Sequence, residues 1–275
     1  MFNLSALYHP LTARPAHANE FRPCTALQPY IRCFWGPASS VEEHQPSVEH
    51  KEIIIPDTCM DIIWELNEAT GSTSIYFCGM NDTPFEIIQE PGRTRNSRFA
   101  IRFYFWAVHF FADNHLREVL NANTDVEHYF STFRQDLSHL LEKASTMTER
   151  IAAAEAYLLI RLERLPRSND NLMNAVYTII KYKGVVTVKE LEANTGLSSR
   201  QLERIFQEYT GVSPKKTADL VRFQNAWQDL YLAADHSCVQ DIVYSYQYSH
   251  QSHFINKFKQ YAGRTPLEAL KYARR

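Results

Sequence analysis

The side chains with the clearest capacity for specific chemistry lie in two short stretches near the C-terminus. Residues three or four positions apart share one face of a helix. The exposed faces expected in the two stretches carry Ser199, Arg200, Glu203, Arg204 and Gln207, and then Gln251, Ser252, Ile255, Asn256 and Lys259. Arginine can form two hydrogen bonds with guanine, and Asn or Gln can do so with adenine. The sequence therefore predicts two polar faces suited to base edges.

The two stretches are copies of one pattern. Five anchor residues recur 52 positions later with the same or a similar residue type: Leu202, Phe206, Tyr209, Gly211 and Pro214 match Phe254, Phe258, Tyr261, Gly263 and Pro266. A fixed offset over five anchors indicates one supersecondary unit used twice.

Each copy is expected to be a short helix that follows a tight turn. Ser198 and Ser249 are predicted N-caps, and a glycine followed by a proline ends each helix. Amphipathic segments at 188–194 and 239–246 precede the turns, and a long helical pattern at 215–234 joins the copies. This is the helix-turn-helix arrangement, which lays its second helix in the DNA major groove. A helical bundle without a DNA role is the alternative, but it leaves the paired polar faces unexplained.

The distribution of charge agrees with contact to phosphate. The formal net charge is -2, but from residue 170 onward fourteen Lys or Arg stand against ten Asp or Glu, whereas the first 169 residues have fifteen against twenty-one. Basic side chains supply non-specific DNA affinity. Arg222, Lys257 and Lys259 are predicted to fix the protein on phosphates.

The C-terminal segment resembles the DNA-binding domain of the AraC/XylS family of transcription regulators, over about 105 residues. The most specific part runs from Gln251 through Pro266. The resemblance implies two helix-turn-helix units that enter successive major grooves. Glu192 stands where a small alanine is common, Gln247 replaces the usual turn glycine, and Asn256 replaces a frequent arginine. We therefore expect a changed second turn and a changed base preference in the second half-site.

The N-terminal part shows the pattern of an antiparallel β domain. Short runs rich in β-branched and aromatic residues alternate with turn residues, at 53–55, 62–66, 75–78, 85–88 and 99–108. We predict an α+β two-domain chain: a β barrel or sandwich, cupin-like or related, with flanking helices over 1–165, a linker at 166–170, and an all-α domain over 171–275 with two helix-turn-helix units joined by a long helix.

The β segment also resembles the N-terminal domain of one branch of this regulator family, through Pro29–Gly36, Pro56–Ile63, Cys78–Met80 and Ala100–Phe103. The resemblance implies a sensing or regulatory role with an undefined ligand. Aromatic and polar residues of these runs could line a small-molecule pocket; the alternative is that the aromatic residues form the barrel core. The candidate ligand-binding residues are Trp35, Asp61, Trp64, Arg102, Tyr104 and Trp106. Asp61 and Arg102 could instead form a structural pair.

Beyond Asp113 the spacing predicts helices. Leu116, Val119 and Leu120 are expected to start the first, Asp125 to cap a short helix at 126–130, and Thr146 with Glu149 to form a capping box. The longer helix that follows carries an apolar stripe of Ile151, Ala154, Leu158, Leu162 and Leu165. The stripe either packs on the β domain or forms a dimer interface.

No catalytic or metal-binding pattern is found. His109, His115, Cys59 and Cys78 lack metal-ligand spacing, and eight glycines form no phosphate loop. Pro23-Cys24 lacks the four-cysteine zinc site of a DNA-repair methyltransferase. We expect no enzyme activity, no cofactor and no metal.

The expected compartment is the cytoplasm. The longest apolar run, 103–111, is too short for a bilayer, no secretion signal is visible, and five cysteines form no C-x-x-C pair. The sequence thus predicts a one-component transcription regulator, with duplex DNA and RNA polymerase as partners, a small-molecule effector or a homodimer as further possibilities, and no membrane. Alternatives are a ligand-independent regulator controlled by a protein partner and a small-molecule-binding enzyme with an accessory DNA-binding module.

Overall fold

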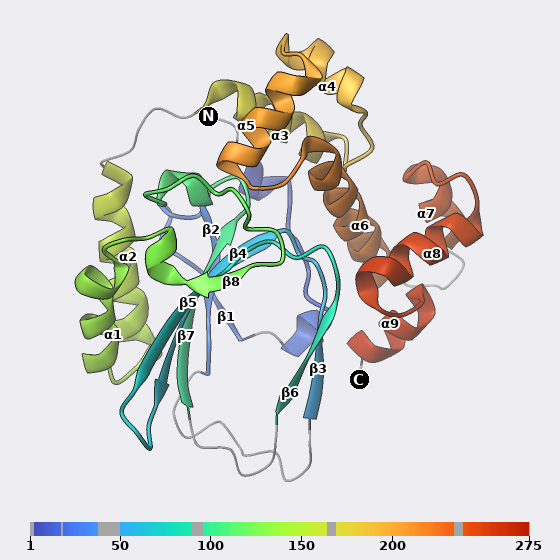
Figure 1. The fold of residues 1–275 in the computed structure, drawn as a ribbon. Coiled ribbons are helices and arrows are strands. Elements are labelled where there is room, and N and C mark those ends of the chain that lie inside the picture. Colours follow the sequence, from blue (N-terminus) through green and yellow to red (C-terminus); the bar gives the residue numbers. More distant parts are fainter. Residues whose placement is uncertain are drawn as a thin grey trace.

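The computed structural model describes residues 3–17, 19–37, 50–89, 96–163, 169–233 and 239–274. A β-rich N-terminal part carries helices on one side, and the C-terminal helices lie over its other side and one end (Figure 1). This arrangement confirms the predicted α+β class.

A six-stranded antiparallel sheet forms the centre of the N-terminal part. Its strands, in spatial order, are β1 (Glu20–Phe21), β2 (Ile31–Trp35), β7 (Asn96–Tyr104), β4 (Cys59–Asn67), β5 (Thr73–Cys78) and β8 (Asn123–Asp125). A separate two-stranded ribbon pairs β3 (His50–Ile54) with β6 (Phe85–Gln89). Every predicted β run contributes a strand, and together they make a sheet and a ribbon.

Two predictions in the following segment were wrong. The last strand ends at Tyr104 instead of residue 108, because Ala107 N donates to Tyr104 O and a 3-10 helix follows at Val108–Phe110. The residues around Leu116 and Val119 form a loop and no helix, with Glu118 and Asn121 at positive φ. Leu116 and Val119 are buried. Their apolar spacing therefore reflects burial in tertiary contacts and does not reflect a helix.

The helices of the N-terminal part cover the sheet. Short 3-10 helices lie at Leu4–Ala6, Pro15–His17 and Val126–His128, a π-helical turn at Arg134–Ser138, and α-helices at α1 (His139–Lys143) and α2 (Met147–Glu163). Asp125 caps the 126–128 turn as predicted. The capping box is also confirmed, since Glu149 N donates to Thr146 Oγ1 and Thr146 N donates to Glu149 Oε2.

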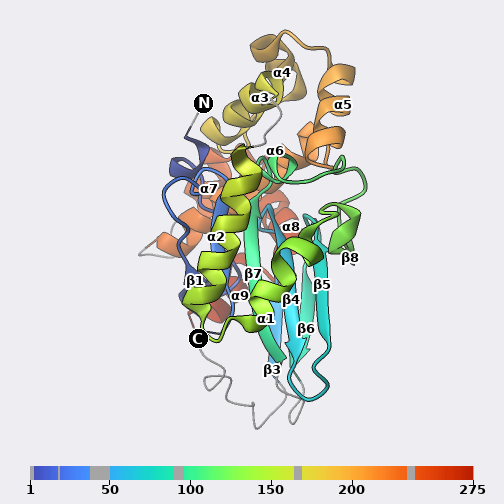
Figure 2. The same cartoon turned by 90° about the vertical axis from the view of Figure 1, so that its left-hand side faces the viewer.

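The apolar stripe of α2 packs within the chain. Ala154 and Leu158 are fully buried, and Ile151 and Leu162 pack against the core. Figure 2 shows α2 lying along the sheet. Leu165 lies outside the described residues. The described part of the stripe is therefore core, which removes the reason for assigning it to a dimer interface.

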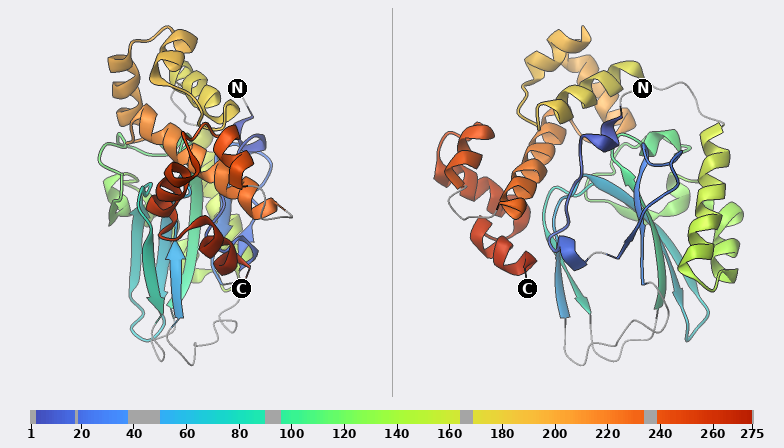
Figure 3. Two further views of the ribbon diagram at one scale, coloured as in Figure 1. Left: turned by 90° about the vertical axis from the view of Figure 1, so that its right-hand side faces the viewer. Right: turned by 180° about the vertical axis from the view of Figure 1, so that it is seen from behind.

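The C-terminal part contains α3 (Asp170–Lys181), α4 (Val188–Thr195), α5 (Ser199–Tyr209), α6 (Pro214–Leu232), α7 (Val239–Ser245), α8 (Gln251–Ala262) and α9 (Pro266–Ala273). α4 with α5 and α7 with α8 are the two expected helix pairs, and α6 joins them (Figure 3). Most of the linker predicted at 166–170 lies outside the described residues. The domain boundaries stay a prediction.

Buried polar contacts join the two parts. Gln224 on α6 is 1% exposed; its amide donates to Leu11 O and Pro56 O at 3.2 and 2.6 Å and accepts from Leu11 N at 2.7 Å. Trp227 Nε1 donates to Thr12 O at 3.1 Å, and Ile53 N donates to the Tyr272 hydroxyl at 3.1 Å. These contacts place residues 11–12 and 53–56 directly under α6 and α9.

Candidate nucleic-acid interface and N-terminal pocket

The first helix pair is defined by local capping. Thr187 caps α4 in a capping box, Gly196 takes the left-handed conformation after it (φ 70°), and Ser198 caps α5 in a box with Gln201. Leu202 is fully buried beneath α5. A glycine in the left-handed region, followed two residues later by an N-cap, makes the tight turn that the sequence predicts.

The outward face of α5 holds the predicted base-reading residues. Arg200, Glu203 and Arg204 are exposed, and Gln207 is half-buried. Ser199 is also exposed, but its backbone N–H and its hydroxyl donate to the Glu192 carboxylate, which lowers the pKa of that carboxyl. The unusual Glu192 thus ties the first helix of the pair to the start of the second.

The second helix pair has a longer turn. Five residues, 246–250, lie between α7 and α8, whereas three residues, 196–198, lie between α4 and α5. Gln247 takes the left-handed conformation at φ 49°. The predicted Ser249 cap was wrong: His250 is the N-cap, with its Nδ1 accepting from His253 N at 3.1 Å. Ser249 Oγ lies 2.9 Å from His253 Nδ1. His250 lies 52 residues after Ser198, which is the offset of the five anchor residues, whereas Ser249 lies 51 residues after it.

Arg222 supports the second turn from α6. Its guanidinium lies over the Tyr248 ring at 4.0 Å, and Nε and Nη2 are buried without a hydrogen-bond partner in the described part of the chain. Such stacking stabilises by about 0.5–2 kcal/mol. A phosphate contact for Arg222 stays a prediction, and the buried nitrogens leave Nη1 as the donor for it.

The outward face of α8 is neutral at its start and basic further on. Gln251, Ser252, Asn256, Lys257 and Lys259 are exposed. The Lys257 ammonium donates to Gln260 at 3.2 Å, and α8 contains no Asp or Glu. Ile255, placed on this face by its spacing, is half-buried and packs on the core. The geometry therefore leaves the other predicted side chains of α8 accessible.

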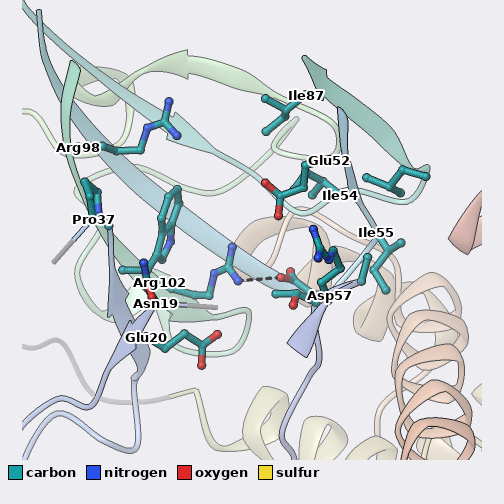
Figure 4. A pocket seen from close by; sticks show the side chains of 16 residues that line it. Asn19, Glu20, Pro37, Glu52, Ile54, Ile55, Asp57, Ile87, Arg98 and Arg102 are labelled. Atoms are coloured by element: carbon teal, nitrogen blue, oxygen red, sulfur yellow. Dashed lines mark ion pairs between the residues drawn. The ribbon is translucent and has the colours of Figure 1, made fainter. Parts of the chain in front are cut away.

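A pocket of about 310 Å³ lies between the β3–β6 ribbon and the main sheet (Figure 4). Its lining residues come from β1 to β3, β6, β7 and the segments next to them: Thr12, Ala13, Arg14, Asn19, Glu20, Trp35, Gly36, Pro37, Glu52, Ile53, Ile54, Ile55, Asp57, Ile87, Arg98 and Arg102. Small-molecule sites have this size and this mixture of apolar walls and few polar groups.

An ion-pair cluster forms the floor of the pocket. Arg102 pairs with Asp57 at 3.1 Å and with both oxygens of Asp61 at 2.9 and 3.1 Å. Trp35 Nε1 donates to Asp61 at 2.8 Å. Burial disfavours the charged guanidinium, but Asp61 and Asp57 raise the pKa of Arg102 above its usual value. Burial raises the pKa of Asp57, against the opposing effect of Arg102. The predicted pairing of Asp61 with Arg102 is present.

The structure separates the predicted ligand-binding residues. Trp35 and Arg102 line the pocket, while Asp61 lies behind Arg102. Tyr104 lines a second hollow of about 390 Å³ beside β1. Trp64 and Trp106 are 0% and 1% exposed and line neither hollow, because both rings fill the core. Placing these two tryptophans at a ligand site was therefore wrong.

Several lining residues escaped the sequence reasoning. Glu52 and Ile87 are opposite each other in the β3–β6 ribbon, and Arg98 extends from β7. Alternation of residue types along β3 and β6 indicates that each strand has two faces. It does not indicate which of these faces points toward the main sheet. Only strand pairing and the position of the ribbon bring these residues together.

Two of the residues considered for a metal site lie beside one tyrosine. The ring centroids of His109 and His115 are 5.2 and 6.2 Å from that of Tyr209. Within the described ranges, no group of three or more His, Cys, Asp or Glu is arranged to hold a metal ion. Among the described helices, none is both long and apolar enough to cross a membrane.

Comparison with known proteins agrees with this geometry. Residues 191–272 match a family described as a helix-turn-helix domain, and residues 19–125 match a domain of unknown function. The probable thc operon regulatory protein of Rhodococcus erythropolis is 33% identical over 88 residues, covering 31% of this chain. The chain spans about a quarter of that relative's length, 26%.

The chain is also similar in part to solved structures. An AraC-type transcriptional regulator from Chromobacterium violaceum is 28% identical, covers 38% of this chain and 94% of its own, and has a TM-score of 0.35. ToxT from Vibrio cholerae is 11% identical, covers 82% of this chain and 98% of its own, and has a TM-score of 0.42.

The two helix pairs on one connecting helix and the matched family define a helix-turn-helix DNA-binding protein. Residues 191–272 therefore form a helix-turn-helix domain that is similar to the DNA-binding domains of AraC-type regulators.

Proposed function

We propose that the protein is a sequence-specific transcription regulator whose DNA-binding part is controlled by its N-terminal part. The observation that carries this proposal is the pair of exposed polar faces on α5 and α8, both supported by α6. Duplex DNA is the partner, and RNA polymerase is the protein that it would influence. The cytoplasm is the proposed compartment, and we propose no enzyme activity.

Each face would read one major groove. Arg200, Glu203 and Arg204 would contact bases in the first, and Gln251, Ser252 and Asn256 in the next, with Gln207 and Ser199 at the edge of the first contact. A good bidentate contact discriminates by about 1–3 kcal/mol. Lys257 and Lys259 would hold the phosphates, which fix register without reading sequence.

Selection of duplexes from random DNA with the full chain tests the reading of two grooves. The expected product is a pair of short half-sites whose centres are separated by about one helical turn, roughly 10 base pairs. A single half-site would show that only one helix pair reads bases. Failure to enrich any sequence would remove the proposed function.

The pocket and the contacts between the two parts support control by a small effector. Residues 12–13 and 53–55 line the pocket, and Thr12 O and Ile53 N also bond to Trp227 and Tyr272 in the C-terminal part. A ligand that repositions these segments would change how the two helix pairs are held. Control by a protein partner remains the competing proposal, and a homodimer is a further possibility.

Gln224→Ala tests whether the contact between the parts matters for DNA binding. The change removes three hydrogen bonds at a buried position and leaves backbone groups unpaired, which costs about 1–3 kcal/mol. We expect altered affinity for the selected duplex together with lower stability. Gln228→Ala, on the same helix and half-buried, is the matched control. Unchanged DNA affinity in both variants would show that the contact between the N-terminal and C-terminal parts does not influence DNA binding.

A further inference from the structure

From the charges around the pocket between the β3–β6 ribbon and the main sheet, we infer that it binds a small monocationic amine with an apolar body, held with its ammonium group against Glu52. The inference rests on the proposed function only in assigning the amine the role of effector. Binding itself is independent of DNA.

Glu52 is the pocket carboxylate left without a counter-ion. Among the described residues it has no ion-pair or hydrogen-bond partner for its side chain, and it is half-buried on β3. Figure 4 shows its carboxylate reaching into the hollow, with Arg98 on the opposite wall. A partly desolvated carboxylate attracts a cation more strongly than one in bulk water.

The guanidinium groups around the pocket are already engaged. Arg98 Nε lies 2.6 Å from Glu65. Arg102 is shared by two carboxylates, Asp57 and Asp61. Because both guanidinium groups are already paired with carboxylates, each would attract an anionic ligand less strongly than an unpaired arginine would.

The remaining lining charges do not change this balance. Glu20 pairs with Arg32 at 3.0 Å, and Arg14 lies over the Tyr272 ring at 5.6 Å. Among the described residues, these groups and their partners comprise five carboxylates, Glu20, Glu52, Asp57, Asp61 and Glu65, and four arginines, Arg14, Arg32, Arg98 and Arg102. The excess is one negative charge, and one ligand cation would neutralise it.

The walls fit an apolar body. Trp35 offers an indole ring, and Ile53, Ile55 and Ile87 supply aliphatic surface. Glu52 and Ile87 occupy directly opposed positions in the ribbon, so the charged and apolar groups adjoin. Burial of apolar ligand surface contributes about 25 cal/mol per Å², and the carboxylate fixes orientation.

Titration calorimetry and thermal shift on the full chain without DNA test the inference. The cationic probes are benzylamine, phenethylamine, tryptamine and cyclohexylamine, and the matched probes are 3-phenylpropionate and phenethyl alcohol. We expect at least one amine to bind and to raise the melting temperature, because a ligand selective for the folded state stabilises it by mass action. The acid should give no shift, and the alcohol should bind at least tenfold more weakly.

Glu52→Gln locates the site. A charge-assisted contact of about 1.5–3 kcal/mol corresponds to a Kd raised about tenfold to a hundredfold. Glu86→Gln, an exposed carboxylate on the ribbon's other strand, should leave the Kd unchanged. Equal amine affinity in Glu52→Gln and the parent chain, preference for the acid, or no binding of any amine at 10 mM overturns the inference. DNA affinity measured without amine reports on the proposed function separately, so one can fail while the other stands.

Discussion

The two helix-turn-helix units share one repeated sequence pattern but differ in what holds them. The first unit touches the N-terminal part at the end of α5: Leu116 N donates to Glu208 O at 3.0 Å, and His109 lies against Tyr209. In the second unit the equivalent tyrosine, Tyr261, packs at 5.1 Å on Phe223 of the connecting helix. The end of α5 is thus held by a backbone hydrogen bond to the N-terminal part, whereas the equivalent end of α8 packs on α6 and the second unit reaches the N-terminal part elsewhere, through Tyr272.

The turn between the two helices also differs from one unit to the other. Gly196 adopts its left-handed backbone without side-chain conflict, whereas Gln247 adopts the same region with a side chain. Arg222 stacks on Tyr248 beside that turn. The reading faces differ as well, since α5 carries Arg200, Glu203 and Arg204 and α8 begins with neutral side chains. Two copies of one sequence pattern are therefore supported by different contacts.

The sharpest test of unequal support is the repeated glycine after each reading helix. Gly211 and Gly263 have nearly equal φ values of 68° and 69°. A Cβ at Gly211 would lie 2.1 Å from Leu116 O, whereas at Gly263 the nearest atom is Pro84 Cγ at 3.4 Å. We expect Gly211→Ala to lower the free energy of unfolding by about 3 kcal/mol or more, from strain and overpacking.

Gly263→Ala is the matched control and should lose about 1–2 kcal/mol from left-handed strain alone. Denaturant melts of both variants measure the difference. Equal losses would show that contact with the N-terminal part does not support the first unit.

A second test uses the pH dependence of His109, which lies between the two parts. Both ring nitrogens are covered, and burial lowers the pKa of His109 to about 4. The neutral ring is favoured in the folded state, so its contribution is complete above the unfolded pKa of about 6.5 and is lost as pH falls toward 4.

Between pH 7 and pH 5 the loss from His109 should be on the order of 2 kcal/mol. Unfolding measured at both pH values should show a smaller change in His109→Phe, which keeps an aromatic ring and cannot titrate. An unchanged pH dependence in that variant would place the effect elsewhere.

The third test concerns the charged reading face. Arg204→Ala should weaken binding to a selected duplex by about 1–3 kcal/mol and affect random DNA far less. Asn256→Ala provides the comparison in the neutral face and should relax specificity in the other half-site. Titrations with both duplexes measure the two effects. Equal losses on selected and random DNA would assign Arg204 to phosphate contact.

The smallest expected effect is at the second turn. Gln247→Gly removes left-handed strain and should raise the unfolding free energy by up to about 1 kcal/mol, since glycine also gains freedom in the unfolded chain. Gln247→Ala keeps the strain and should give no gain. A lower midpoint in Gln247→Gly would indicate that the glutamine side chain stabilises the turn.

Sequence reasoning succeeded where local chemistry is sufficient. The caps at Ser198, Thr146 and Asp125, the turn at Gly196 and the amphipathic helices depend on neighbours a few residues apart. It failed at Leu116 and Val119, whose burial against the C-terminal part imitates a helical spacing. It also failed at Ser249, because a serine is the commoner cap residue, whereas the position 52 residues after Ser198 is His250, whose ring nitrogen caps α8.

The sequence by itself determined the repeated helix pairs, their outward polar faces and the β character of the N-terminal part, because periodicity and capping are local properties of the chain. Tertiary structure alone decided which residues surround the pocket and where each unit contacts the N-terminal part. Glu52 and Arg98 lie on opposite walls of the hollow, and Gln224 bonds to Leu11 and Pro56, although the residues of each set are tens to hundreds of positions apart in the sequence. Such contacts depend on how strands and domains pack, and no local pattern encodes that packing.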